Sequence, residues 1–234
     1  MGSQLKAAGR LIWPDYGALW HGGLQELAMG APDVAASSLS DELYGPLLEF
    51  LSLTHRVRPF AYDWRLSLRE AARELAQHLE QCLPEAEREG QPVHLVAHSS
   101  GGLVVRAMMA DGGLGAALWL RIAQLPQSRL LMLGTPNFGS YEAMRWLTGF
   151  NPTLVQLSLL DPVHDTSDLV NLMRQYPGLL ELLPFAPEDP DFADPARWES
   201  IQSNLPDGTS PPISLMPVMA TGSSLPLLGS PLPA

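Results

Sequence analysis

The residues best suited to carry out chemistry lie in the sequence AHSSG at residues 97–101. A serine two residues after a small residue and two before a glycine, placed between a strand and a helix, is typical of a nucleophile elbow. This turn is so tight that Ala97 and Gly101 have to be small. Ser99 is therefore the candidate nucleophile, with its hydroxyl exposed at the end of the strand. The alternative is a turn serine without chemistry.

The next residue, Ser100, opens the predicted helix. The first amides of a helix have no acceptor within it, and the positive end of the helix dipole lies at the same place. We therefore expect the Ser100 N–H to donate a hydrogen bond to the oxyanion that forms when Ser99 attacks a carbonyl carbon. A second glycine, Gly102, permits close packing of this helix.

Alternating strands and helices are predicted around this turn. Short apolar runs bounded by glycine or polar residues have the length of buried parallel strands, and apolar residues at helical spacing indicate helices. One helix begins at a capping box formed by Ser67 and Glu70 and should end at Pro84. The other predicted segments are a helix at 43–53, a strand at 56–62, a strand at 92–97, a helix at 101–110 and a strand at 129–133. This alternation predicts the α/β class, with a parallel sheet and helices on both of its faces.

The chain changes character after Gly134. Residues 137–200 contain helical fragments and prolines without a convincing strand, which predicts a cap or lid inserted into the sheet rather than a connection. Residues 213–220 return to a strand-like composition that a proline interrupts. The predicted organisation is a core of residues 1–136 and 201–234 that carries a cap at residues 137–200.

The composition limits the partners and cofactors of the protein. Aspartate and glutamate outnumber lysine and arginine by 25 to 14, and the resulting formal net charge of −11 argues against a nucleic-acid partner. Cys82 is the only cysteine, so neither an intrachain disulfide nor a thiolate metal cluster is expected. Asp189, Asp191 and Asp194 have calcium-like spacing, but interposed prolines and the lack of a loop glycine favour an acidic, solvated loop. We expect no metal and no cofactor.

A serine hydroxyl becomes a good nucleophile when an imidazole within about 3 Å removes its proton. His164 is the only histidine after Ser99 and is predicted to be a solvent-facing loop residue. His98 neighbours Ser99, but adjacent side chains at an elbow diverge, so we expect it to pack or hydrogen-bond behind the turn. His94 is predicted to lie in the core. Surface positions are expected for His21, His55 and His78.

Several motifs, in matching order and spacing, resemble the lecithin:cholesterol acyltransferase family of α/β-hydrolases. They are IWP at 12–14, FAYDWR at 60–65, AHSSG at 97–101, LGTPNFGS at 133–140, YPGLLELLP at 176–184 and MATG at 219–222. The resemblance covers nearly the whole chain, and the second and fourth motifs are the most diagnostic. It implies an α/β-hydrolase fold and a serine esterase, phospholipase or acyltransferase that acts on lipid-like esters through an acyl-enzyme on Ser99.

The same resemblance implies further residues and partners. Trp146, Leu147 and Phe150 fall in the region that forms the lid of the family and would line an acyl-binding wall, with packing inside the cap as the alternative. Asp63 and Arg65 are expected to pair, either as a structural ion pair or beside the substrate. The implied partner is a lipid or small-molecule ester. Transient contact with a membrane or lipid surface is compatible with the same resemblance.

The resemblance also implies a chain truncated at both ends. MGSQL at residues 1–5 is similar to the end of a family motif whose loop supplies a second oxyanion amide, and the catalytic Asp and His are expected beyond Ala234. The alternative interpretation is therefore a catalytically inactive fragment or a lipid-binding relic. No signal peptide or transmembrane segment is recognised, and the default expectation is the cytoplasm.

Overall fold

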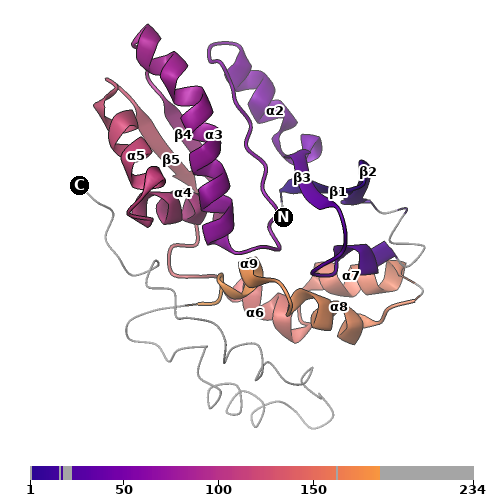
Figure 1. Ribbon diagram of the computed structural model, residues 1–234. Helices are drawn as coiled ribbons and strands as arrows, with labels where there is room; N and C mark the ends of the chain where they lie inside the picture. Colours follow the sequence, from indigo (N-terminus) through magenta and orange to yellow (C-terminus); the bar gives the residue numbers. More distant parts are fainter. Residues whose placement is uncertain (1, 16, 18–22, 162, 185–234) are drawn as a thin grey trace.

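The computed structural model describes residues 2–15, 17, 23–161 and 163–184 of the chain. Two groups of elements are visible in Figure 1. One is built on a parallel pair of strands, and the other on an antiparallel sheet with short helices. The mixture of helices and strands is compatible with the predicted α/β class.

The parallel group contains the segments that flank Ser99. Its elements are α3 (Leu68–Glu89), β4 (His94–His98), α4 (Ser100–Ala110), α5 (Leu114–Gln124) and β5 (Arg129–Leu133). The two strands pair in parallel over their full length, and the three helices pack against one another around a shared apolar core. The strands and the helix predicted on either side of the turn are therefore confirmed.

Helices cover one face of this parallel pair. Ala97 of β4 is buried against them, whereas Val96 and Leu131, which point to the other face, are 43% and 51% exposed. A parallel sheet with helices on both faces is therefore not shown by the described residues.

The second group contains the segments at the start of the chain and those after residue 140. Its elements are β1 (Ser3–Ala7), β2 (Arg10–Trp13), η1 (Gly23–Leu27), β3 (Val34–Leu39), α6 (Tyr141–Thr148), α7 (Pro152–Leu160), α8 (Thr166–Met173) and α9 (Pro177–Leu180). β1 lies between β2 and β3 and is antiparallel to both. Side chains of β1, β2, η1, α7 and α8 share one apolar core.

The antiparallel sheet was not predicted from the sequence. β1 and β2 are joined by a two-residue turn in which Ala8 and Gly9 have φ angles of 48° and 83°. Positive φ at both positions is the type I′ geometry that matches the twist of a hairpin. Alanine adopts this conformation less readily than asparagine or aspartate, so Ala-Gly is a weak hairpin signal.

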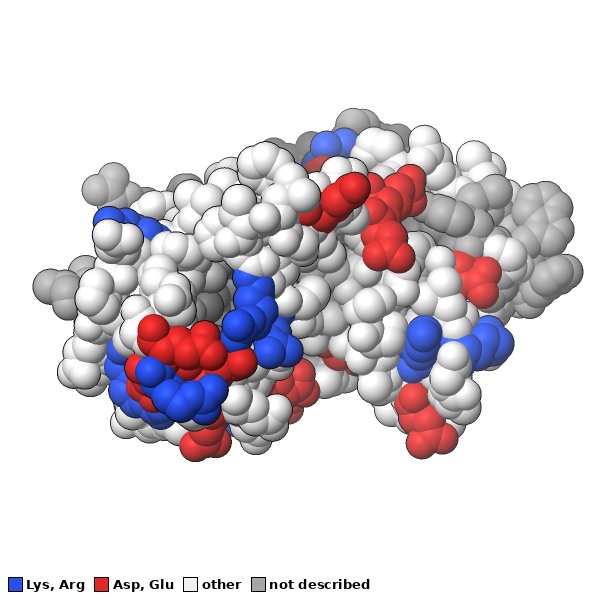
Figure 2. Space-filling model, turned by 90° about the horizontal axis from the view of Figure 1, so that it is seen from above, with Lys and Arg blue, Asp and Glu red and all other residues white. Residues whose placement is uncertain are grey.

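The predicted strand at residues 56–62 is wrong, because these residues form an extended segment outside any strand ladder. Arg56 and Arg58 of this segment pair with Glu85 of α3. The side chains of this segment therefore contact a helix and solvent, and no neighbouring strand among the described residues pairs with it. Figure 2 shows charged side chains in mixed acidic and basic clusters of this kind, separated by uncharged surface.

Helix α3 begins where it was predicted to begin but ends later than predicted. It continues through Pro84 to Glu89, where Gly90 with φ 62° ends it. Pro84 is exposed, so the carbonyl that loses its helical partner faces water. At the start, Ser67 is the N-cap and its side chain accepts a hydrogen bond from the Arg69 N–H at 3.2 Å, but the Glu70 side chain does not complete a capping box. Glu181, and not Glu70, accepts hydrogen bonds from the Ser67 hydroxyl and the Leu68 N–H, each at 2.7 Å.

Residues 137–184 form helices and turns without a strand in the part that the structure describes, in agreement with the helical character predicted for this segment. The division into core and cap remains a prediction. The predicted strand at 213–220, the acidic residues Asp189, Asp191 and Asp194, and His21 lie outside the described residues.

None of the described helices is, by itself, long and apolar enough to cross a membrane. Helices α4 and α5 meet the criteria of length and composition only as a pair, and the chain bends by 100° between them.

Candidate active site

Ser99 occupies the junction between β4 and α4 with an unusual backbone conformation. Its φ and ψ angles are 54° and −130°, a region that residues with a side chain rarely adopt. Such a conformation costs on the order of 1–3 kcal/mol and persists only where the surrounding structure imposes it. The Ser99 N–H donates to the Leu133 carbonyl at 2.8 Å, which extends the pairing of β4 with β5 into the turn. This conformation occurs at the position where the sequence predicts a nucleophile elbow.

The Ser99 side chain is exposed, as predicted. Within the described residues, its hydroxyl makes no hydrogen bond and does not cap α4. A hydroxyl with these properties is accessible to a substrate from solvent.

The start of α4 approaches the loop after β5 closely. A Cβ atom on Gly102 would lie 2.0 Å from Oγ1 of Thr135, in the LGTPNFGS motif. A Cβ atom on Gly101 would meet no described atom within 4 Å. The close packing predicted at Gly102 is therefore confirmed, whereas the small size expected to be necessary at Gly101 is not required by any described neighbour.

Ser100 presents a free amide and a partnered side chain. Its N–H makes no hydrogen bond with the described residues, as expected for the first residue of a helix. Its hydroxyl lies 2.9 Å from the hydroxyl of Tyr62, which belongs to the FAYDWR motif. Local sequence patterns do not predict this contact of Tyr62, because 38 residues separate it from Ser100 along the chain.

The histidines of β4 lie on its exposed face. His98 is hydrogen-bonded through Nδ1 to the Tyr44 hydroxyl of α2 (Asp41–Ser52) at 2.9 Å, in agreement with a bond behind the turn. His94 is exposed and contacts the His55 ring edge to face, so its predicted place in the core is wrong. It points away from the helices because the side chains of β4 alternate between the two faces.

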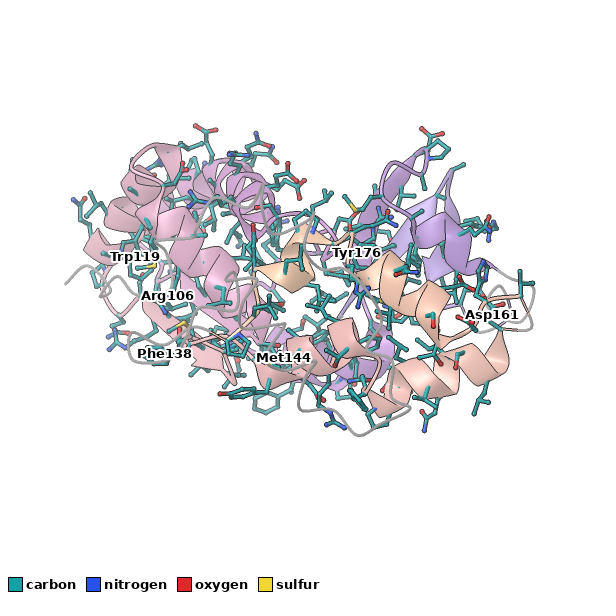
Figure 3. The ribbon with its side chains drawn as sticks, turned by 90° about the horizontal axis from the view of Figure 1, so that it is seen from below. Arg106, Trp119, Phe138, Met144, Asp161 and Tyr176 are labelled. Atoms are coloured by element: carbon teal, nitrogen blue, oxygen red, sulfur yellow. The ribbon has the colours of Figure 1, made fainter. Side chains whose placement is uncertain are left out.

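His164 is not the solvent-facing residue predicted from its loop. Its side chain is only 14% exposed, and its Nδ1 lies 2.8 Å from the carboxylate of Asp161, which is fully buried. Figure 3 shows Asp161 at the opposite side of the molecule from Arg106 of α4. The other ring nitrogen of His164 lies 3.3 Å from the side-chain amide nitrogen of Gln25 in η1. None of the five described histidines is hydrogen-bonded to the Ser99 hydroxyl: His55, His78, His94, His98 and His164.

The Asp63 and Arg65 side chains of the FAYDWR motif form the predicted ion pair. Both are buried, and three hydrogen bonds of 2.6–3.2 Å join the guanidinium to the carboxylate. The remaining guanidinium nitrogen donates to the carbonyls of Leu27 and Ala28 at the end of η1. These contacts are those of a structural ion pair that fixes the loop before α3.

The same loop packs against the YPGLLELLP motif. Trp64 meets the Tyr176 ring edge to face at 5.6 Å. A Cβ atom on Gly178 would lie 2.4 Å from the carbonyl oxygens of Trp64 and Leu66, so this contact requires glycine. Two motifs more than 100 residues apart in sequence therefore pack directly against each other.

The three apolar residues predicted to contact an acyl chain have different surroundings. Leu147 is fully buried, Trp146 is partly buried against the core of the second group, and Phe150 is 54% exposed. Trp146 packs against an apolar core that β1, β2 and η1 share with α7 and α8, so this core is not confined to the predicted cap. The role of Trp146 and Leu147 in acyl binding, like that of Phe150, stays a prediction.

Within the described residues, no three histidine, cysteine, aspartate or glutamate side chains are close enough to hold a metal ion.

A strained serine thus lies between a parallel strand and a helix, where the sequence predicts a nucleophile elbow. The sequence model of the lecithin:cholesterol acyltransferase family matches residues 53–191, more than half of the chain. The chain belongs to this family.

One curated relative is the uncharacterized protein YJR098C of Saccharomyces cerevisiae, which is 38% identical over 55 residues. The match covers 24% of this chain and 8% of the yeast protein, so the chain spans a small part of that relative's length. No solved structure matches the chain.

Proposed function

We propose that the protein transfers acyl groups from lipid-like esters to an alcohol or to water, through an acyl-enzyme on Ser99. The observation that carries the proposal is the strained, exposed conformation of Ser99 at the junction of β4 and α4. Membership of the lecithin:cholesterol acyltransferase family supports acyltransferase or lipase chemistry and a lipid substrate.

The reaction proceeds in two balanced steps. The Ser99 oxygen forms a bond to the ester carbonyl carbon, its proton is removed, and the Ser100 N–H stabilises the negative charge on the carbonyl oxygen. The bond to the leaving alcohol then breaks, and that alcohol receives the proton. In the second step, the oxygen of water or of another alcohol forms a bond to the acyl carbon, and the bond from that carbon to the Ser99 oxygen breaks. The proton of the acceptor passes to the Ser99 oxygen, and a carboxylic acid or a new ester is released.

The proposal extends to the fold. An α/β-hydrolase core is assigned to residues 1–136 and 201–234, and a cap to residues 137–200. The parallel pairing of β4 with β5 and the helices after residue 140 support this division. Trp146, Leu147 and Phe150 are then candidates for contact with the acyl chain, and Phe150 has the surface that such contact requires.

None of the five described histidines is hydrogen-bonded to the Ser99 hydroxyl. A serine without an imidazole partner is a weak nucleophile at neutral pH. We therefore expect slow acylation of this chain by an activated probe, and faster acylation when imidazole in the buffer supplies the missing base.

Labelling with a fluorophosphonate probe tests the proposal. We expect an adduct that peptide mass spectrometry places on Ser99, with a rate that rises with the concentration of imidazole. Ser99→Ala should abolish the adduct. Ser52→Ala, at an exposed serine at the end of α2, is the matched control and should label like the wild type.

If the folded wild-type protein forms no adduct on Ser99, even at high imidazole concentration, the proposed reaction is wrong. Vesicle co-sedimentation of the same protein would then distinguish a lipid-binding protein without catalysis from one that does not bind lipid.

A further inference from the structure

The contact between Tyr62 and Ser100 joins two parts of the site that no local sequence signal connects. The phenol oxygen of Tyr62 lies 2.9 Å from Oγ of Ser100, and both residues are partly buried. Ser100 is the first residue of α4, and its backbone N–H is unbonded among the described residues. Any group that holds the Ser100 side chain therefore also limits the direction of that N–H.

Tyr62 is itself held in place from two sides. Its N–H donates to the hydroxyl of Ser3, a buried residue at the start of β1, at 3.2 Å. Its ring stacks on Phe60 with 6.2 Å between the ring centroids. Burial raises the pKa of the Tyr62 phenol, although its bond to Ser100 acts in the opposite direction, so the hydroxyl is neutral in the working range of pH.

Other contacts fix the start of α4 less completely. The packing of Gly102 against Thr135 and the bond from the Ser99 N–H to Leu133 limit how far the helix moves toward β5. Gly101 has no described neighbour that a Cβ atom would meet, so no close contact restrains the turn at this position. The Tyr62 hydroxyl supplies the restraint at Ser100.

We propose that Tyr62 is a positioning residue, whose hydroxyl orients the first turn of α4 and so directs the Ser100 N–H toward the oxyanion. This inference rests on the proposed function of Ser99. Tyr62 acts through Ser100 and does not touch the reacting atoms. Its removal should therefore lower the rate of acylation and leave probe binding almost unchanged.

The first experiment measures fluorophosphonate labelling of Ser99 at several probe concentrations, in buffer with imidazole. A single hydrogen bond between neutral groups corresponds to a factor of about three to ten in an equilibrium or rate. We expect Tyr62→Phe to lower the maximal labelling rate by about this factor. The probe concentration for half-maximal rate should stay unchanged. Tyr141→Phe, at an exposed tyrosine of α6, is the matched control and should label like the wild type.

A double-mutant cycle tests whether the two hydroxyls act together. Ser100→Ala keeps the backbone N–H and removes only the side-chain bond, so it should slow labelling as much as Tyr62→Phe does. The combined variant should label no more slowly than either single variant. If the two losses multiply instead, the hydroxyls act independently and the positioning role is wrong.

A second readout does not depend on activity. In amide-resolved nuclear magnetic resonance spectra, Tyr62→Phe should shift the Ser100 N–H signal and speed its hydrogen exchange, whereas Tyr141→Phe should do neither. An unchanged Ser100 signal would overturn the inference, with or without labelling. If the wild type is not labelled but the Ser100 signal responds as expected, the proposed reaction fails and the restraint on the amide stands.

Discussion

A Cβ atom on Gly102 would lie 2.0 Å from Oγ1 of Thr135, closer than any real contact between such atoms. Gly102 belongs to the first turn of the helix after Ser99, and Thr135 to the loop after β5. The Thr135 hydroxyl is buried and has no hydrogen-bond partner among the described residues. The contact therefore sets how closely the helix approaches the loop, and with it the position of the Ser99 turn.

Gly102→Ala should destabilise the protein and slow labelling of Ser99. The added methyl group has to push α4 away from Thr135, and overpacking of this kind typically costs about 1–3 kcal/mol. The displacement moves the Ser99 hydroxyl and the Ser100 N–H together. Urea unfolding gives the change in the free energy of unfolding, and fluorophosphonate labelling at equal folded concentration gives the change at the site.

Gly101→Ala is the control for this prediction, because the neighbouring position has open space. Alanine is favoured over glycine inside a helix by up to about 1 kcal/mol, so this variant should be as stable as the wild type or more stable. Equal losses from both variants would show that the Thr135 contact does not control the turn.

The local structure around Ser99 could be predicted from the sequence, and the long-range contacts could not. The short apolar runs before residue 99 and after residue 128 predicted β4 and β5, because a buried parallel strand can be recognised from its own residues. Ser67 caps α3 as its position predicts, but a second cap comes from Glu181, 113 residues from Leu68, and not from Glu70. A local pattern carries no information about such a partner.

The restraint on Ser100 is another contact that local patterns do not reveal. Tyr62 lies in a segment predicted as a strand, where its hydroxyl would have pointed to one side of a sheet. The segment does not pair with any described strand, and its side chains contact the neighbouring helices instead. The FAYDWR motif marked this segment as part of the family resemblance. Its contacts with Ser100 at the start of α4 and with Tyr176 beside α9 are seen only in the fold.

Arg65→Met should destabilise the protein strongly. The Arg65 and Asp63 side chains are 5% and 7% exposed, so the variant leaves a buried carboxylate without its partner. Breaking a buried ion pair in this way typically costs about 3–5 kcal/mol. Arg145→Met, which breaks an exposed pair with Glu142, should cost less than about 1 kcal/mol. Chemical denaturation measures both, and a similar small loss for the two would mean that the Asp63 pair is not structural.

Gly178→Ala should loosen the attachment of α9 to the loop before α3. The new Cβ atom would lie 2.4 Å from the Trp64 and Leu66 carbonyl oxygens, and backbone atoms cannot move aside as a flexible side chain does. We expect a loss of about 1–3 kcal/mol in the free energy of unfolding and faster limited proteolysis between α8 and α9. Gly45→Ala, in α2 with its nearest neighbour atom at 4.0 Å, should show neither effect.

Asp161 should make the stability of the protein depend on pH in the acid range. Burial alone would raise the pKa of this carboxyl, but hydrogen bonds from the His164 ring and from the Val163 and His164 N–H groups outweigh burial and lower the pKa. A carboxyl with a lower pKa in the folded state contributes stability that is complete above its unfolded value, about 3.9. This contribution is lost as the pH falls through the folded value.

Asp161→Asn should therefore lower the free energy of unfolding at pH 7 by about 1–3 kcal/mol, because the amide keeps one acceptor oxygen but loses the charge. The difference from the wild type should shrink as the pH falls below about 4, where both forms are uncharged at this position. Urea unfolding between pH 2.5 and 7 gives the two curves. Asp33→Asn, at an exposed turn with no hydrogen bond to its carboxylate from the described residues, should follow the wild type. A constant difference between Asp161→Asn and the wild type over this range would show that ionisation of Asp161 does not stabilise the fold.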